Sequence, residues 1–163
     1  MRPSRRWGFV AAGWASLFAA LHFFWALGGS VGLATSAGRQ LAEDRPGWFV
    51  AGGLWGVGSL LLVAAALALA LAGAIVRGRR RLVLVLGGAA VALLLLIRGI
   101  GVKVLLLSGA LDGNTVLEPG QRHWTLMLWN PWFVAGGAAF GLSTLGLRGR
   151  PTRDGRRWVR GRA

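Results

Sequence analysis

Four long apolar stretches, separated by short polar segments, form the main pattern of this chain. They cover residues 8–29, 48–76, 82–107 and 124–147. An α-helix needs about 20 apolar residues to cross a hydrocarbon layer about 30 Å thick, and each stretch reaches that length. The pattern therefore predicts an all-α fold, an integral membrane bundle of four transmembrane helices.

The length of the chain leaves room for one membrane domain. Four spans and their connecting segments use residues 1–147, and the arginine-rich residues 148–163 are expected to form a disordered basic tail. The basic start of the first stretch is typical of a secretory signal. Its apolar run of about 22 residues, however, exceeds the 7–15 of a signal peptide. We therefore interpret this stretch as a retained span.

Basic residues in the connecting segments predict the orientation. An excess of Lys and Arg in short loops marks the cytoplasmic side of a membrane. Arginine dominates the N-terminus, residues 77–81 and the tail, whereas residues 30–47 and 108–123 balance arginine with Asp and Glu. The Arg-, Gly- and Ala-rich composition is typical of a bacterial protein. All five segments agree on one orientation, with both termini cytoplasmic, and we therefore expect a multi-pass protein of the cell inner membrane.

Composition narrows the classes of function. The formal net charge of +14 would indicate nucleic-acid binding in a soluble protein. Here the charge lies in the connecting segments and the tail, so we expect no nucleic-acid partner. The arginines of the tail are instead expected to bind anionic lipid at the inner leaflet. The absence of cysteine excludes disulfide formation, thiol catalysis and cysteine-ligated metal sites.

Small residues predict where helices end or approach one another. The glycine pair at residues 28–29 is suited to end the first helix. Gly52 and Gly56, and likewise Gly137 and Gly141, have the spacing that lets membrane helices pack closely. We interpret these pairs as packing positions and assign them no chemistry.

Three ionisable residues interrupt the apolar stretches: His22, Arg98 and Lys103. Such residues are costly within a membrane and usually face the bundle interior or find a partner. At about 1.5 Å of rise per residue, His22 and Arg98 lie at a similar level in the outer half of the membrane. We therefore predict an outward-opening pocket floored by His22 and Arg98 and rimmed by Lys103, Asn130 and tryptophans. Structural roles stay open: snorkelling for Lys103, an interior hydrogen bond for His22, and bonds to backbone carbonyls for Arg98.

Residues 21–29 carry a motif in which His22 is followed three residues later by Trp25 and then by Ala-Leu-Gly-Gly. This segment resembles the opening motif of the bacterial membrane-protein family called domain of unknown function 3995. Arg98 and the Asn-Pro-Trp of residues 130–132 are also similar to that family. The resemblance covers most of the chain. It implies a four-helix integral membrane protein and singles out His22, Trp25 and Arg98, but it implies no activity.

These observations favour a small membrane protein that binds a lipid or another amphipathic or anionic ligand. The expected ligand-binding residues are His22, Trp25, Arg98, Lys103 and Asn130. The lack of a catalytic constellation argues against an enzyme, and we expect no cofactor and no metal site. One alternative is an accessory or structural subunit that packs against a larger membrane complex or against copies of itself. A less favoured alternative is a haem- or quinone-linked membrane enzyme, with His22 and His123 as the axial haem ligands.

Overall fold

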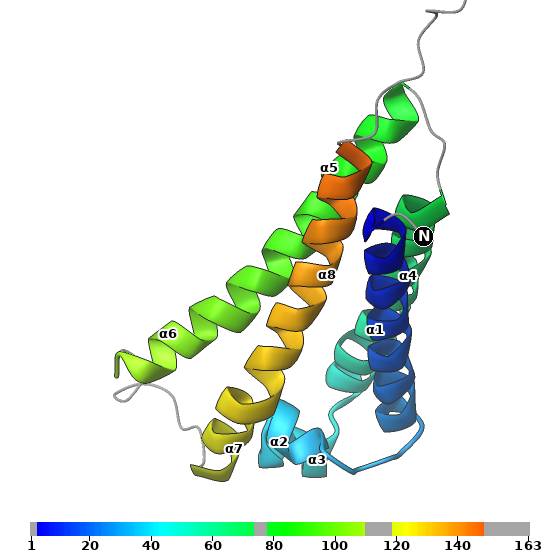
Figure 1. Ribbon diagram of the computed structural model, residues 1–163. Coiled ribbons are helices and arrows are strands. Elements are labelled where there is room, and N and C mark those ends of the chain that lie inside the picture. Colours follow the sequence, from blue (N-terminus) through cyan, green and yellow to red (C-terminus); the bar gives the residue numbers. More distant parts are fainter. Residues whose placement is uncertain (1–2, 74–77, 110–118, 149–163) are drawn as a thin grey trace, which may run out of the picture.

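The computed structural model describes residues 3–73, 78–109 and 119–148, and nearly all of them are helical (Figure 1). The elements in chain order are α1 (Pro3–Ala26), α2 (Leu33–Ala37), α3 (Arg39–Asp44), η1 (Phe49–Gly56), α4 (Val57–Gly73), α5 (Arg79–Leu96), η2 (Ile97–Gly101), α6 (Val102–Leu107), α7 (Pro119–Trp124), η3 (Thr125–Trp129) and α8 (Asn130–Arg148), where η denotes a π-helix. No strand occurs within the three described ranges, and the predicted all-α class is confirmed. The predicted basic tail, apart from Arg148, lies outside them.

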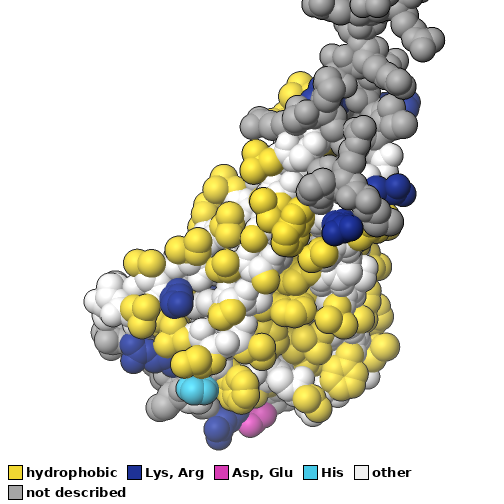
Figure 2. All heavy atoms as spheres, in the orientation of Figure 1, with side chains coloured by type: hydrophobic (Ala, Val, Ile, Leu, Met, Phe, Trp, Pro, Cys, Tyr) yellow, Lys and Arg dark blue, Asp and Glu magenta, His cyan; other side chains and the backbone are white. Residues whose placement is uncertain are grey.

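Three helical runs are long and apolar enough to cross a membrane: Arg5–Ala26, Phe49–Gly73 and Arg79–Leu107. They correspond to the first three predicted spans and indicate a membrane protein. Figure 2 shows apolar side chains over most of the face in view, with Lys and Arg mainly toward its two ends. The fourth apolar stretch forms a continuous helical run made of α7, η3 and α8.

The helices form two pairs. α1 packs along α4, α5 packs along α8, and contacts between α1 and α8 join the pairs (Figure 1). Small residues bring paired helices together: a Cβ at Gly8 would lie 2.6 Å from the Cβ of Ala72, and a Cβ at Gly137 would lie 3.1 Å from the carbonyl oxygen of Ala92. The packing role expected of Gly137 is therefore confirmed. A Cβ at Gly52 would meet nothing within 4 Å, so the role expected of Gly52 is wrong.

The first helix ends where glycine allows a turn, slightly before the end of the apolar stretch. α1 stops at Ala26, and Gly28 follows with a φ of 108°, a conformation that a Cβ would disfavour. Arg45, directly after α3, donates guanidinium hydrogen bonds to the carbonyl oxygens of Trp25, at 2.9 Å, and Gly29. The bond to Trp25 adds a second partner to a carbonyl that also accepts from the amide of Gly28, and both bonds hold the α2–α3 segment against the end of α1.

The two ends of the bundle differ in structure. α1 begins, α4 ends, α5 begins and α8 ends at one end, which we call the basic end because α1 and α5 begin there with arginines (Figure 1). The opposite end, which we call the loop end, carries α2, α3 and α7. The three π-helical segments lie in the part of each run nearer the loop end. The residues predicted to bind a ligand also come from this part of the bundle.

Candidate functional site

His22 and Trp25 lie one turn apart on the inward face of α1, where 8% and 1% of their surfaces are exposed. The Nδ1 of His22 lies 2.9 Å from the carbonyl oxygen of Phe18. Because a carbonyl only accepts, Nδ1 is the donor, and Nε2 of the neutral ring is an acceptor. Nε2 makes no hydrogen bond to the described part of the chain. The indole N–H of Trp25 donates to the carbonyl oxygen of Val31 at 2.7 Å, so this side chain also fixes the turn after α1.

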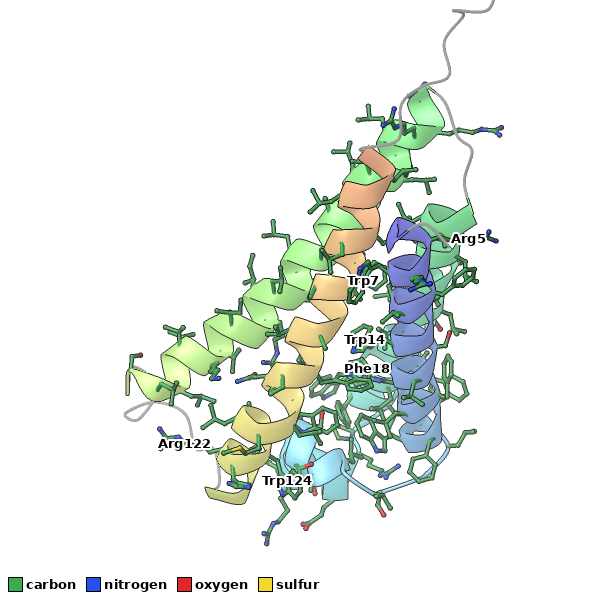
Figure 3. The ribbon with its side chains drawn as sticks, viewed as in Figure 1. Arg5, Trp7, Trp14, Phe18, Arg122 and Trp124 are labelled. Carbon is green, nitrogen blue, oxygen red and sulfur yellow. The ribbon has the colours of Figure 1, made fainter. Side chains whose placement is uncertain are left out.

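Seven rings from α1, η3 and α8 form one connected group, which we call the aromatic cluster. Its members are Trp14, Phe18, His22, Trp25, Trp129, Trp132 and Phe133. Phe18 is central, since its ring centroid lies 4.6 Å from that of His22, 5.7 Å from Phe133 and 6.3 Å from Trp129. Figure 3 shows Trp14 and Phe18 on the side of α1 that faces α8. His22 is therefore enclosed by rings at the α1–α8 interface.

Asn130 stands at the start of α8 and is completely buried, with 0% of its surface exposed. Its backbone is helical, with φ of −63° and ψ of −48°, and its side chain makes no cap. Both polar atoms of its amide, Nδ2 and Oδ1, lack a hydrogen-bond partner among the described residues, and so do the indole nitrogens of Trp129 and Trp132. A buried polar group without a partner costs roughly 1–3 kcal/mol. Several such groups are thus gathered within one turn of helix.

Arg98 belongs to η2, on the other side of α8. Its Cζ lies 5.0 Å from the ring centroid of Phe133, a cation–π contact, and the side chain is exposed. Gly99 is buried, and a Cβ there would lie 2.9 Å from the carbonyl oxygen of Asn130. η2 therefore packs directly on the backbone of Asn130. Phe133 links the two halves of the site, because it contacts Arg98 on one side and Phe18 on the other.

The five predicted site residues are brought together to different degrees. His22 and Trp25 share the aromatic cluster, and Asn130 immediately follows Trp129, a member of that cluster. Arg98 reaches the cluster through Phe133. Lys103 is exposed on α6 and forms no hydrogen bond or ion pair with the residues that the structure describes. His22 and Asn130 are both buried by neighbouring side chains.

Sequence reasoning expected tryptophans at the rim without singling out Trp129 and Trp132, and it missed Phe18 and Phe133 as parts of the site. Phe18 lies one turn before His22, so the helical spacing that joined His22 to Trp25 was the signal for it. The three residues from α8 and η3 flank Asn130, which was the signal on that side. Their contacts with Phe18 join the first and last apolar stretches. Contacts between residues so far apart in the sequence could not be predicted from a local pattern.

The two histidines proposed as haem ligands lie on different helices, His22 on α1 and His123 on α7. His123 lies on α7, is exposed, and has its ring centroid 5.8 Å from that of Trp124. Within the described ranges, no group of three or more His, Cys, Asp and Glu side chains is arranged to hold a metal ion.

Two π-helical turns belong to the site, and a third packs on α1. η2 carries Arg98 and Gly99, η3 carries Trp129 and leads into Asn130, and η1 packs on α1. The π-helix is rare and appears frequently at functional sites. Three such segments at the same end of the bundle therefore mark this region as a candidate functional site. The unpaired polar atoms of Trp129, Asn130 and Trp132 lie in the same region.

Comparison with protein families confirms the expected resemblance. A family model described as "Protein of unknown function (DUF3995)" matches residues 15–140. The matched region contains all five predicted site residues and every member of the aromatic cluster except Trp14. No curated protein and no solved structure matches the chain.

Proposed function

We propose a function from the residues of the chain itself, because the chain belongs to the DUF3995 family of proteins of unknown function. In this proposal it is a four-span membrane protein that binds a lipid or another amphipathic molecule beside Asn130. The site lies between α1, η2, η3 and α8 in the half of the bundle nearer the loop end. No catalytic role is assigned to any residue.

The burial of Asn130 carries this proposal. Its amide is completely buried and neither polar atom has a partner among the described residues. Because no surface of Asn130 is exposed, bulk water does not reach its amide. A bound molecule with polar atoms would supply the missing partners for the amide and for the indole N–H groups of Trp129 and Trp132. Aromatic rings around these atoms suit the apolar part of the same molecule.

The arrangement of the helices supports a fourth span. η3 and α8 together cover Thr125–Arg148, which corresponds to about 36 Å of helix at about 1.5 Å per residue, enough for a hydrocarbon layer of about 30 Å. At the basic end, Arg81 Nη2 donates to the carbonyl oxygen of Leu147 at 3.1 Å and joins the start of α5 to the end of α8. The arginines at this end support a cytoplasmic location for it, in a cell inner membrane.

Native mass spectrometry of the full-length chain in mild detergent tests the proposal. The wild type is expected to retain a defined small molecule or lipid, and Asn130→Leu, similar in size but unable to form hydrogen bonds, is expected to lose it. Ser143→Ala is the matched control. Ser143 is on the same helix, its hydroxyl is also buried and unpaired among the described residues, and it lies outside the aromatic cluster.

Two results would contradict ligand binding. One is the same unselective mixture of lipids on all three proteins. The other is a defined species that Asn130→Leu retains as fully as the wild type. Co-purification of a second membrane protein with the chain, in place of a small molecule, would favour the accessory-subunit alternative.

A further inference from the structure

We propose that the molecule bound beside Asn130 is a phospholipid with an anionic headgroup, whose phosphate is held by Arg98. This inference rests on the proposed function, since it names the class of ligand for the same site. Arg98 binds the negative charge of the phosphate, and Asn130 and the neighbouring indoles form hydrogen bonds with uncharged polar atoms of the lipid.

Arg98 is a cation whose counter-charge is not provided by the described part of the chain. Glu43 and Asp44, both on α3, are the acidic residues that the described ranges contain. Within those ranges Arg98 forms no ion pair and no hydrogen bond, and its recorded contact is the face of Phe133. A guanidinium inside a candidate span requires a partner because an unpaired charge is costly there. Its exposure on the surface of the bundle leaves it open to a lipid.

The position of Arg98 along its helix fits a phosphate. Arg98 follows Arg79, at the basic end of α5, by 19 residues, which is about 28 Å at about 1.5 Å per residue. A hydrocarbon layer is about 30 Å thick, so the guanidinium reaches the level of the opposite headgroups by extending along the helix. Lys103 is exposed five residues further on and adds a second cation beyond Arg98 on the same side of the layer.

The hydrogen-bonding groups of the site also favour an acceptor-rich ligand. Four groups of the site are donors, namely the indole nitrogens of Trp129 and Trp132, the Nδ2 of Asn130 and the guanidinium of Arg98, whereas the Oδ1 of Asn130 and the Nε2 of His22 are acceptors that a headgroup hydroxyl can pair. Oxygen atoms of a phosphodiester and of the acyl esters accept hydrogen bonds and donate none. Charge-assisted hydrogen bonds from Arg to phosphate are among the stronger ones in proteins. Phe133 contacts both Arg98 and Phe18, so the phosphate position adjoins the aromatic cluster.

The test compares phosphatidylglycerol with phosphatidylcholine, which differ in net headgroup charge. Full-length wild type, Arg98→Gln and Arg5→Gln are stripped of lipid and titrated with each lipid, and the bound fraction is measured by native mass spectrometry. Arg5 is the matched control, because its Cζ also lies over a phenylalanine ring, 5.7 Å from the centroid of Phe9, at the basic end of α1.

We expect the wild type and Arg5→Gln to bind phosphatidylglycerol about tenfold more tightly than phosphatidylcholine. Arg98→Gln is expected to bind both lipids equally and to keep its hydrodynamic size. Lys103→Gln should reduce the preference by a smaller factor, because the cation that lies over Phe133 is Arg98. A preference that Arg98→Gln leaves unchanged would overturn the inference, as would a wild type without any preference.

Two further results separate this inference from the proposed function. If the wild type retains a lipid without net charge that Asn130→Leu loses, the site exists but its ligand is not anionic, and the inference is overturned alone. If the wild type retains no defined species and binds neither lipid, both ideas are overturned. If glycerol 3-phosphate competes with phosphatidylglycerol at equal concentration, the site recognises a free phosphate ester, and the lipid assignment is overturned.

Discussion

Asn130 and Gly99 meet where η2 crosses α8, and their contact leaves no space for a larger residue. A Cβ at position 99 would lie 2.9 Å from the carbonyl oxygen of Asn130 and 2.9 Å from Cγ2 of Val134. The first of these atoms belongs to the backbone of a helix and cannot move without displacing the helix. Gly99 therefore sets the distance between the two helices that carry Arg98 and Asn130.

Gly99→Ala is expected to destabilise the protein, because the added methyl group forces α8 away from η2. Overpacking of this kind typically costs about 1–3 kcal/mol. Gly101→Ala is the control within the same π-helical segment, since a Cβ there would lie no closer than 4.0 Å, to Cγ2 of Ile97. Thermal unfolding in one detergent measures both. Equal unfolding temperatures for the two variants would contradict the packing described for η2.

At the scale of elements, the short α2–α3 segment is held to the long helices by specific polar contacts. Arg45 has a φ of 42°, unusual for a residue other than glycine, and from this position its guanidinium reaches the end of α1. Trp25 forms a second link through Val31. The segment thus covers the aromatic cluster at the loop end, and it depends on a small number of hydrogen bonds.

Arg45→Met is expected to loosen this cover, because it keeps the length of the side chain and removes its donors. Leaving the carbonyls of Trp25 and Gly29 without these partners should cost about 1–3 kcal/mol. Hydrogen exchange should rise first in the amides of α2. Gln40→Met, at an exposed position on α3, serves as the control and should leave exchange unchanged. If exchange in α2 is the same in both variants, Arg45 does not hold the segment.

Much of the helical content could be predicted from the sequence, and the π-helical segments could not. The first three candidate spans could be predicted because a helix that crosses a membrane needs a long, uninterrupted run of apolar residues, and such a run is visible in the local sequence. The spacing of His22 and Trp25 also correctly predicts a shared face. A π-helical turn, by contrast, depends on how neighbouring helices pack, and glycines such as Gly53, Gly56 and Gly99 mark these segments only weakly. The burial of Asn130 also depends on η2, an element distant in sequence.

At the scale of the whole molecule, the membrane placement that we propose puts the two ends of the bundle on opposite sides of the membrane. The basic end carries arginines at the starts of α1 and α5, whereas exposed Trp48 and Trp124 lie near the loop end. Tryptophan is enriched at the interface between membrane and water. Both patterns agree with helices that run perpendicular to a membrane.

The chain contains no cysteine, so single cysteines report the topology directly. Gln40→Cys on α3 should react with a membrane-impermeant thiol reagent added to intact cells. Arg80→Cys on α5 should react only after the membrane is permeabilised. Both positions are exposed. Reaction of both cysteines from the same side would contradict the proposed orientation.

The most direct test of ligand binding beside Asn130 is the unfolding temperature of the wild type and Asn130→Leu, measured without lipid and after addition of a total bacterial lipid extract. Without lipid, the variant should be at least as stable as the wild type, because it lacks the unpaired buried amide. With lipid, the wild type should gain stability, by about 2.7 kcal/mol when the ligand is at 100 times its dissociation constant, and the variant should gain much less. Equal responses of the two proteins to lipid, or no response in either, would contradict a ligand paired with Asn130.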